Sequence, residues 1–213
     1  WIHEPELPAL PAALLASGLV LRAAACFGLA LLLGLLLWLR PGRWPGAWLP
    51  AQQLALVLFA LTALQPLVAL GDHQRQRPVR QIAAAVQAQR RPAEPLAMVG
   101  ILKPSLHYYS RQVVLFEGIE ATGPINLNDR LARERRRGLL PSPVQPGASL
   151  LLVIDQRTAA LPHWRGLAHR TLASAALYQL WRVERSALQR HARQLQAATG
   201  AGPTWQRPRP ERY

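Results

Sequence analysis

A short polar segment between two apolar runs holds the residues best suited to binding chemistry. It reads LKPSLHYYSRQVV and contains Lys103, Ser105, Tyr108, Tyr109 and Arg111. Lys103 is the only lysine in the chain, since every other cation is an arginine. A cation and a hydroxyl where a strand ends and a helical turn begins favour an anion such as phosphate, because free backbone N–H groups point there. The tyrosines and Arg111 add donors and a stacking face for a sugar.

A structural role would account for the same residues. Ser105 would then cap the helical turn, the tyrosine rings would pack on a sheet, and Lys103 would be solvated. The sequence contains no G-x-G-x-x-G, G-x-x-x-x-G-K-[ST], H-E-x-x-H or G-x-S-x-G motif. The acidic pair Glu117 and Glu120 follows a strand and belongs either to acid–base chemistry or to a solvated loop.

Metal and cofactor signals are weak. The six histidines are scattered, and Cys26 is the only cysteine, which excludes a cysteine-based metal site and an intrachain disulfide. We therefore expect no cofactor in this segment, and the sequence leaves a divalent metal undetermined.

The elements that must position the polar segment follow from hydrophobic periodicity. The patterns predict strands over 96–101, 112–117, 149–154 and 177–184, a helical turn over 105–110, and helices over 78–90, 126–137 and 186–198. A helix is the alternative for 177–184. We expect Asn126 or Asn128 to cap the helix over 126–137, and Ser186 to cap the helix over 186–198, which Gly200 ends. For residues 156–176 the pattern predicts irregular structure that includes a loop. The alternation predicts a small α/β domain with a mixed or parallel sheet.

Two apolar runs precede this domain. Residues 14–39 and 47–70 are each long enough to cross a bilayer, and tryptophans flank the turn between them. Arg22 is the one charge in the first run; it either pairs with a lipid phosphate or a carboxylate, or snorkels to the interface. The second run contains polar or helix-breaking residues that are typical of packing against other helices: Gln52, Gln53, Thr62, Gln65 and Pro66. The alternative is that a few uncharged polar groups are tolerated anywhere in a long span. The fold class is thus an α-helical transmembrane hairpin followed by a small α/β domain.

Charge and orientation complete the predicted organisation. All but one of the 14 net positive charges lie after residue 70. The arginines in the turn between the apolar runs favour a cytoplasmic turn, whereas Arg75, Arg77 and Arg80 after the second run favour the opposite orientation. We give more weight to the turn, because charge in a short loop counts for more than charge in a long domain. We expect an extracytoplasmic loop over 1–11, two membrane helices within 12–70, an extracytoplasmic domain over 71–198 and a disordered tail over 199–213. Two spans and the lack of an aromatic platform between the arginines make nucleic acid an improbable partner. The first residue is Trp1, not Met, so we also expect a fragment of a longer protein.

A family resemblance rests on these features. Two apolar helices joined by a short Arg/Trp turn, then a domain containing KPSLHYYSRQVV and LYQLWRVERSALQRHA, resemble the C-terminal end of bacterial membrane glycosyltransferases. These are the polyprenyl-phosphate-sugar-dependent enzymes of GT-C type, of the mannosyltransferase and aminoarabinose-transferase kind. The resemblance covers most of residues 12–198 and is most specific over 103–114.

The resemblance implies an enzyme of the inner (plasma) membrane, multi-pass, with its soluble domain in the periplasm. It would transfer a hexosyl or pentosyl group from a polyprenyl-phosphate carrier to a lipid or protein acceptor. The family's acidic catalytic residues lie near the N-terminal end of the membrane body, so none is carried over, and we expect this segment alone to be inactive. The alternative is a two-span anchor with a basic module that binds anionic lipid or polymer without catalysis.

Overall fold

The computed structural model describes residues 10–39, 46, 48–136 and 148–205, and the chain divides into two compact units. The first unit ends at Arg77 and the second begins at Pro78. This division lies later than the predicted boundary near residue 70, because the second long helix continues through the polar residues that follow the apolar run.

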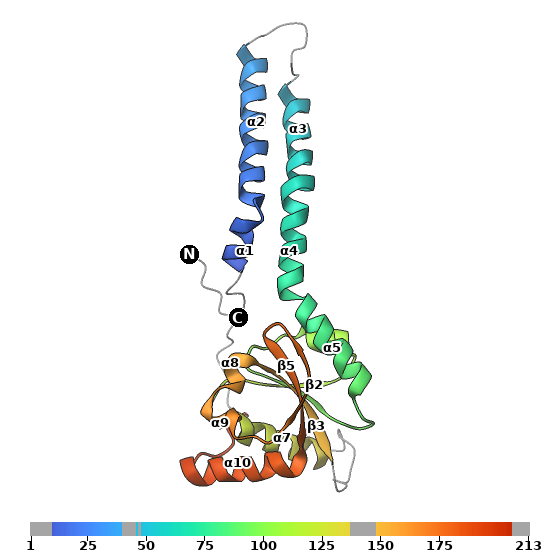
Figure 1. Ribbon diagram of the computed structural model, residues 1–213, viewed down its shortest axis with the longest axis vertical. Coiled ribbons are helices and arrows are strands. Elements are labelled where there is room, and N and C mark those ends of the chain that lie inside the picture. Colours follow the sequence, from blue (N-terminus) through green and yellow to red (C-terminus); the bar gives the residue numbers. More distant parts are fainter. Residues whose placement is uncertain (1–9, 40–45, 47, 137–147, 206–213) are drawn as a thin grey trace. The chain divides into compact units, whose positions relative to one another are not determined.

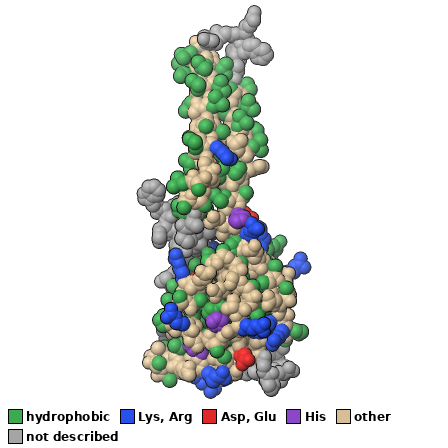
Figure 2. All heavy atoms as spheres, in the orientation of Figure 1, with side chains coloured by type: hydrophobic (Ala, Val, Ile, Leu, Met, Phe, Trp, Pro, Cys, Tyr) green, Lys and Arg blue, Asp and Glu red, His purple; other side chains and the backbone are tan. Residues whose placement is uncertain are grey.

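The first unit is a pair of long helices (Figure 1). Helix α1 (Leu10–Ala16) and helix α2 (Leu19–Leu39) are separated at Gly18, which has a φ of 67°. The second helix comprises α3 (Trp48–Phe59), the π-helical turn η1 (Ala60–Leu64) and α4 (Gln65–Arg75). The ranges Leu19–Leu39 and Trp48–Arg75 are long and apolar enough to cross a membrane. Green hydrophobic side chains cover both helices in Figure 2, as lipid-facing helices require.

Two of the polar residues in the second helix face α2. The amide nitrogen of Gln52 lies so near Gly34 that a Cβ there would be 3.1 Å from it. The hydroxyl of Thr62 lies 3.6 Å from the sulfur of Cys26 and donates to the carbonyl of Leu58. Contacts between helices therefore explain these polar positions, as the sequence predicts.

The π-helical turn has a local cause. Pro66 follows it directly in the first turn of α4. Proline has no N–H, and its ring clashes with the carbonyl four residues earlier in a regular α-helix. A wider turn before Pro66 relieves that clash without ending the helix.

The second unit is built on a mixed sheet, one of the two sheet types that the sequence predicts, and it has five strands where the sequence predicts four. Its strands are β1 (Leu96–Val99), β2 (Val114–Glu117), β3 (Ser149–Asp155), β4 (Arg170–Ala175) and β5 (Tyr178–Glu184), in the order β2-β1-β3-β5-β4. Strand β1 is parallel to β2 and β3, whereas β5 is antiparallel to β3 and β4. Figure 1 shows helices on both sides of this sheet. Strand β4 lies within residues 156–176, for which the sequence predicts irregular, partly loop structure.

The sheet buries an apolar layer on each face. Helix α5 (Arg77–Gln89) covers one face with Val79, Ile82 and Val86, together with Leu106 of the short helix α6 (Ser105–Ser110). Helix α7 (Gly123–Arg136) and helix α10 (Arg185–Thr199) cover the other face. Alternate residues of the central strands supply both layers, so β1 and β3 are wholly buried, as continuous apolar runs predict.

Several sequence predictions about helix ends are wrong. Helix α7 begins at Gly123, and Asn126 is buried inside it, where its amide donates to the carboxylate of Glu117 at 3.1 Å. Glu117 is therefore not in a solvated loop. Helix α10 begins after Glu184 with no side-chain cap, so Ser186 does not cap it, whereas Gly200 ends it in the left-handed conformation, as predicted.

The stretch over 156–176 and the tail also differ from expectation. Two short helices, α8 (Gln156–Ala159) and α9 (Pro162–Arg165), precede β4. In the tail, Thr204 and Trp205 contact α7: the Thr204 N–H donates to Asn126 at 2.7 Å, and the Trp205 indole N–H donates to Asp129 at 2.8 Å. Residues 137–147 and 206–213 lie outside the described part of the chain.

Candidate functional site

The loop that leaves β1 is held by a buried carboxylate at the end of β3. Asp155 accepts hydrogen bonds from the N–H of Ile101 at 3.0 Å and from the N–H and hydroxyl of Thr158 at 3.0 and 2.6 Å. Gly100 has a φ of 88°, and a Cβ there would lie 2.0 Å from the Asp155 carboxylate. Only glycine fits between strand and carboxylate, so the loop enters α6 along one fixed path.

At the start of α6 the structure differs from the interpretation in which Ser105 is a cap and Lys103 is solvated. Lys103 is buried rather than solvated, and its backbone N–H points at the sulfur of Met98, 3.3 Å away. The N-cap of α6 is Pro104 and no side chain caps this end, so Ser105 is not the cap. Ser105 itself is half-buried in the first turn of the helix.

The remaining candidates lie at the other end of α6. Arg111 ends the helix in the left-handed conformation, with a φ of 53°. Because β1 and β2 are parallel, α6 must run back from the carboxyl end of β1 to the amino end of β2. It therefore separates Lys103 and Ser105 from Arg111 by its whole length.

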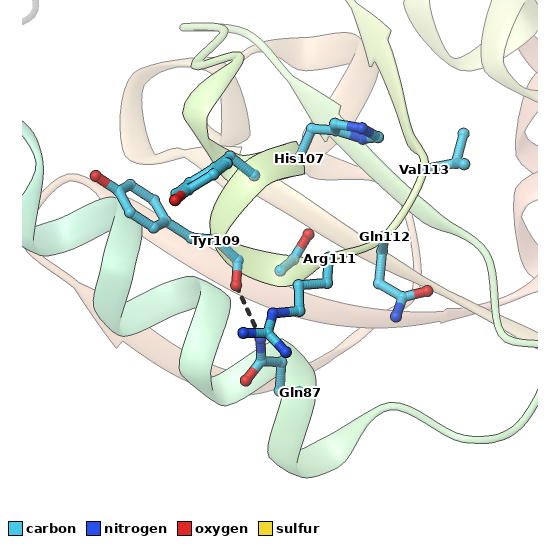
Figure 3. Close-up of a pocket in the computed structure, with 8 residues that line it drawn as sticks. Gln87, His107, Tyr109, Arg111, Gln112 and Val113 are labelled. Carbon is cyan, nitrogen blue, oxygen red and sulfur yellow. Dashed lines mark hydrogen bonds between the residues drawn. The ribbon is translucent and has the colours of Figure 1, made fainter.

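An open groove of about 930 Å³ surrounds this second end (Figure 3). Eight residues line it: Gln87, His107, Tyr108, Tyr109, Ser110, Arg111, Gln112 and Val113. The structure thus brings together Tyr108, Tyr109 and Arg111 of the predicted set, whereas Lys103 and Ser105 do not line this groove. The sequence predicts the site at the carboxyl end of β1, whereas this groove lies beside the amino end of β2.

The groove contains polar groups that sequence reasoning missed. Ser110 is 1% exposed, and within the described chain its hydroxyl has no hydrogen-bond partner. Gln87 reaches the groove from α5 and donates to the carbonyl of Tyr109 at 2.8 Å, as the dashed line in Figure 3 shows. Ser110 adjoins the predicted residues in the chain, but nothing in the sequence places Gln87 beside them.

Aromatic and charged groups give the groove its character. The rings of Tyr108 and Tyr109 meet edge to face with centroids 5.4 Å apart, and Tyr108 is 77% exposed. The guanidinium of Arg80 lies 6.0 Å from the centroid of the Tyr109 ring. None of the eight lining residues is acidic and Arg111 is exposed, so the groove is suited to a polar ligand that carries negative charge.

Two titratable groups with shifted pKa values lie outside the groove. Burial opposes ionisation of Glu94, but hydrogen bonds from Arg182, Ser149 and the Arg91 N–H outweigh it and lower the pKa of this carboxyl below 4.5. Burial also lowers the pKa of His163, which the charge of His191 depresses further, against a hydrogen bond to the Ile119 carbonyl. Within the described ranges, no group of three or more His, Cys, Asp or Glu side chains forms a metal-binding cluster.

Fold and site together define a class of protein: two apolar helices long enough to span a membrane, followed by an α/β domain with a polar, aromatic groove. A family model described as "Cyanobacterial RgtA-type glycosyltransferase, C-terminal domain" matches residues 89–199. The chain belongs to this family. The match begins at the last residue of α5 and ends at the last residue of α10, so it covers the whole sheet.

Two solved structures resemble the chain. They are crystal structures of ArnT from Cupriavidus metallidurans, one in the apo state and one bound to undecaprenyl phosphate. The first has 20% identity and a TM-score of 0.47 over 86% of this chain, and the second has 19% identity and a TM-score of 0.45 over 78%. The chain spans 37% and 30% of the lengths of these two proteins. No curated protein matches its sequence significantly.

Proposed function

We propose that the chain is the C-terminal portion of an integral-membrane glycosyltransferase. The observation that carries this proposal is the family match over residues 89–199 in a chain that also has two membrane-spanning helices. The proposed reaction transfers a hexosyl or pentosyl group from a polyprenyl-phosphate carrier to a lipid or protein acceptor. A donor whose carrier chain lies in the bilayer requires an enzyme that is held there too, which agrees with the apolar surfaces of α2 and α3.

Substrate contact is assigned to the polar segment around α6. Tyr108, Tyr109 and Arg111 are the residues proposed to face substrate directly, since they line the groove. Lys103 and Ser105 remain candidates at the opposite end of the helix. Arg22 is exposed on α2, and both of its roles, pairing with a lipid phosphate and snorkelling to the interface, stay predictions.

The proposed location is the inner membrane, with the α/β domain on its periplasmic side. The support is the pair of arginines in the short segment between the two spans, because short loops rich in arginine stay in the cytoplasm. Protease treatment of spheroplasts tests this orientation. We expect the domain to be digested without membrane lysis, and protection of the domain until lysis would reverse the assignment.

A transfer assay tests the proposed reaction. Membranes that contain the protein encoded by the complete gene are incubated with a radiolabelled polyprenyl-phosphate sugar, and label is measured in the lipid and protein fractions. We expect transfer above that of membranes without the protein. If no fraction gains label and the protein instead binds anionic vesicles in a salt-sensitive manner, the alternative of a non-catalytic basic module is favoured.

A further inference from the structure

The open groove at the end of α6 is large enough to hold a small molecule. Its volume of about 930 Å³ lies within the range of ligand pockets. Two elements form its wall: Gln87 comes from α5, and the other lining residues come from α6 and the residues before β2. Figure 3 shows the Arg111 side chain extending from the end of α6 toward α5.

The polar groups of the groove favour a ligand with both hydroxyl groups and negative charge. Arg111 presents a guanidinium whose planar fork matches a phosphate, and no acidic side chain lines the groove to neutralise it. Ser110 also lines the groove, where its hydroxyl is almost wholly buried and has no hydrogen-bond partner in the described chain. The Gln112 amide offers further donors and an acceptor for hydroxyl groups.

The aromatic part favours a ring with an apolar face. Tyr108 is 77% exposed, which is unusual for a side chain of this size without a partner surface. Its ring is braced edge to face by Tyr109, and the Tyr109 carbonyl is tied to Gln87 of α5. A rigid exposed ring beside a cation suits the C–H face of a sugar better than it suits a free anion.

We infer that this groove binds a phosphorylated sugar. Arg111 holds the phosphate, and Tyr108 stacks on the sugar ring. The inference deepens the proposed function and rests on it for its biological meaning, because it assigns the groove to the phosphate-bearing sugar part of a substrate. The binding itself requires no transfer chemistry and can be measured separately.

Saturation-transfer NMR on the full chain in detergent micelles tests the binding. The probes are glucose 1-phosphate and glucose, with inorganic phosphate added as a competitor. We expect saturation transfer to the ring protons of glucose 1-phosphate, about tenfold weaker binding of glucose, as loss of a charge-assisted contact predicts, and partial competition by phosphate. Equal binding of glucose and glucose 1-phosphate, or no binding of either, would overturn the inference.

Variants place the binding in the groove. Arg111→Gln is expected to weaken glucose 1-phosphate binding about tenfold, and Arg111→Lys to weaken it less, because lysine keeps the charge but loses the fork. Tyr108→Ala should lose binding that Tyr108→Phe retains. Arg193→Gln changes an exposed arginine on α10, on the other face of the sheet, and is the matched control.

The outcomes separate this inference from the proposed function. Unchanged binding in Arg111→Gln with an intact far-UV spectrum rejects the groove even if sugar transfer is observed. Binding that depends on Arg111 and Tyr108, when the protein encoded by the complete gene transfers no sugar, supports the groove and counts against the proposed transfer reaction. If inorganic phosphate competes as strongly as glucose 1-phosphate does, the groove is an anion site that does not recognise the sugar.

Discussion

Arg111 combines an unfavourable backbone conformation with an exposed cationic side chain. Its φ of 53° and ψ of 33° place it in the left-handed region, where glycine and asparagine are usual at a helix end. Lys103, at the other end of α6, is buried in a loop that Asp155 and Gly100 hold. The two cations of one short sequence segment therefore occupy different environments: one is part of the packed domain and one faces a groove.

Gly100 is the residue most sensitive to substitution in this loop. Gly100→Ala places a methyl group on the Asp155 carboxylate and strains a φ of 88°, so we expect the free energy of unfolding to fall by about 3 kcal/mol. Urea unfolding in mild detergent, followed by tryptophan fluorescence, measures this loss. Gly202→Ala is the control, since nothing lies within 4 Å of a Cβ there. Equal stability of the two variants would contradict the described loop.

Glu94 predicts a loss of stability in acid. Its carboxylate is 3% exposed and accepts hydrogen bonds from Arg182 at 2.9 and 3.2 Å and from Ser149. Because its folded pKa is lowered, its contribution is fully present above the ordinary value of 4.5 and is lost as pH falls through the folded pKa. In Glu94→Gln the free energy of unfolding should no longer fall for this reason below pH 4.5. At pH 7 it should be lower than that of the unsubstituted protein by about 3 kcal/mol, because Arg182 loses its buried partner. An unchanged pH profile of urea unfolding in Glu94→Gln would refute the assignment.

At the scale of elements, the direction in which α6 runs determines which of the candidate substrate-binding residues lie in the same groove. The helix begins beyond the carboxyl end of β1 and ends where the chain turns into the amino end of β2. Its Leu106 is fully buried against the layer that α5 covers, which anchors the helix on that face. The groove is therefore a consequence of the β1–α6–β2 connection, with α5 as its second wall.

The left-handed end of α6 predicts opposite effects of two substitutions. Arg111→Asn should raise the free energy of unfolding by about 0.5 kcal/mol, because asparagine tolerates this conformation, whereas β-branched Arg111→Val should lower it by about 1 kcal/mol. Urea unfolding compares the two directly. Arg111→Asn should also lose glucose 1-phosphate binding, so that stability and binding change in opposite directions. Identical unfolding midpoints for the two variants would contradict the described backbone.

The contact between the tail and α7 predicts a role for Trp205. The guanidinium groups of Arg130 and Arg133 lie 5.9 and 5.5 Å from its ring, and its N–H donates to Asp129. Trp205→Ala should therefore destabilise the domain by about 1–2 kcal/mol. Trp205→Phe keeps an aromatic ring but lacks the hydrogen bond, so it should lower the free energy of unfolding by about half as much. A tail that can be truncated before Thr204 without loss of stability would contradict this contact.

At the scale of the whole molecule, apolar surface and positive charge occupy different units. The first unit exposes large hydrophobic side chains along α2 and α3, while nearly all of the net positive charge lies after residue 70. The apolar unit supplies retention in the membrane, and the charged unit carries the domain that defines the family. Retention should therefore be independent of ionic strength.

Membrane extraction tests this division of roles. We expect the protein to stay in the membrane pellet at 1 M salt, where charges are screened beyond about 3 Å, and to be released by detergent. The control is a variant in which exposed arginines of α10 are replaced by glutamine, which should be retained equally. Release by salt alone would show that the basic surface holds the protein at the bilayer.

Local burial patterns made much of the fold predictable. The apolar runs over 14–39 and 47–70 predicted the two long helices, because a helix in lipid needs an apolar surface over the full bilayer thickness. Hydrophobic periodicity also predicted a strand over 96–101 and a helix over 78–90, where the structure has β1 and α5. The resemblance carried by KPSLHYYSRQVV predicted the family that the model match shows.

The sequence by itself thus determined the two spans, the mixed α/β domain and the segment that carries Tyr108 and Arg111. Only the tertiary structure decided that Lys103 is buried, that Asn126 binds Glu117 instead of capping α7, and that Gln87 and the unpartnered Ser110 belong to the groove. The physical reason is that hydrophobic periodicity is a pattern among near neighbours in the chain, and it indicates only which residues are buried. The partners of a buried polar group come from distant elements, and they are fixed only when the strands pair and α6 packs against α5.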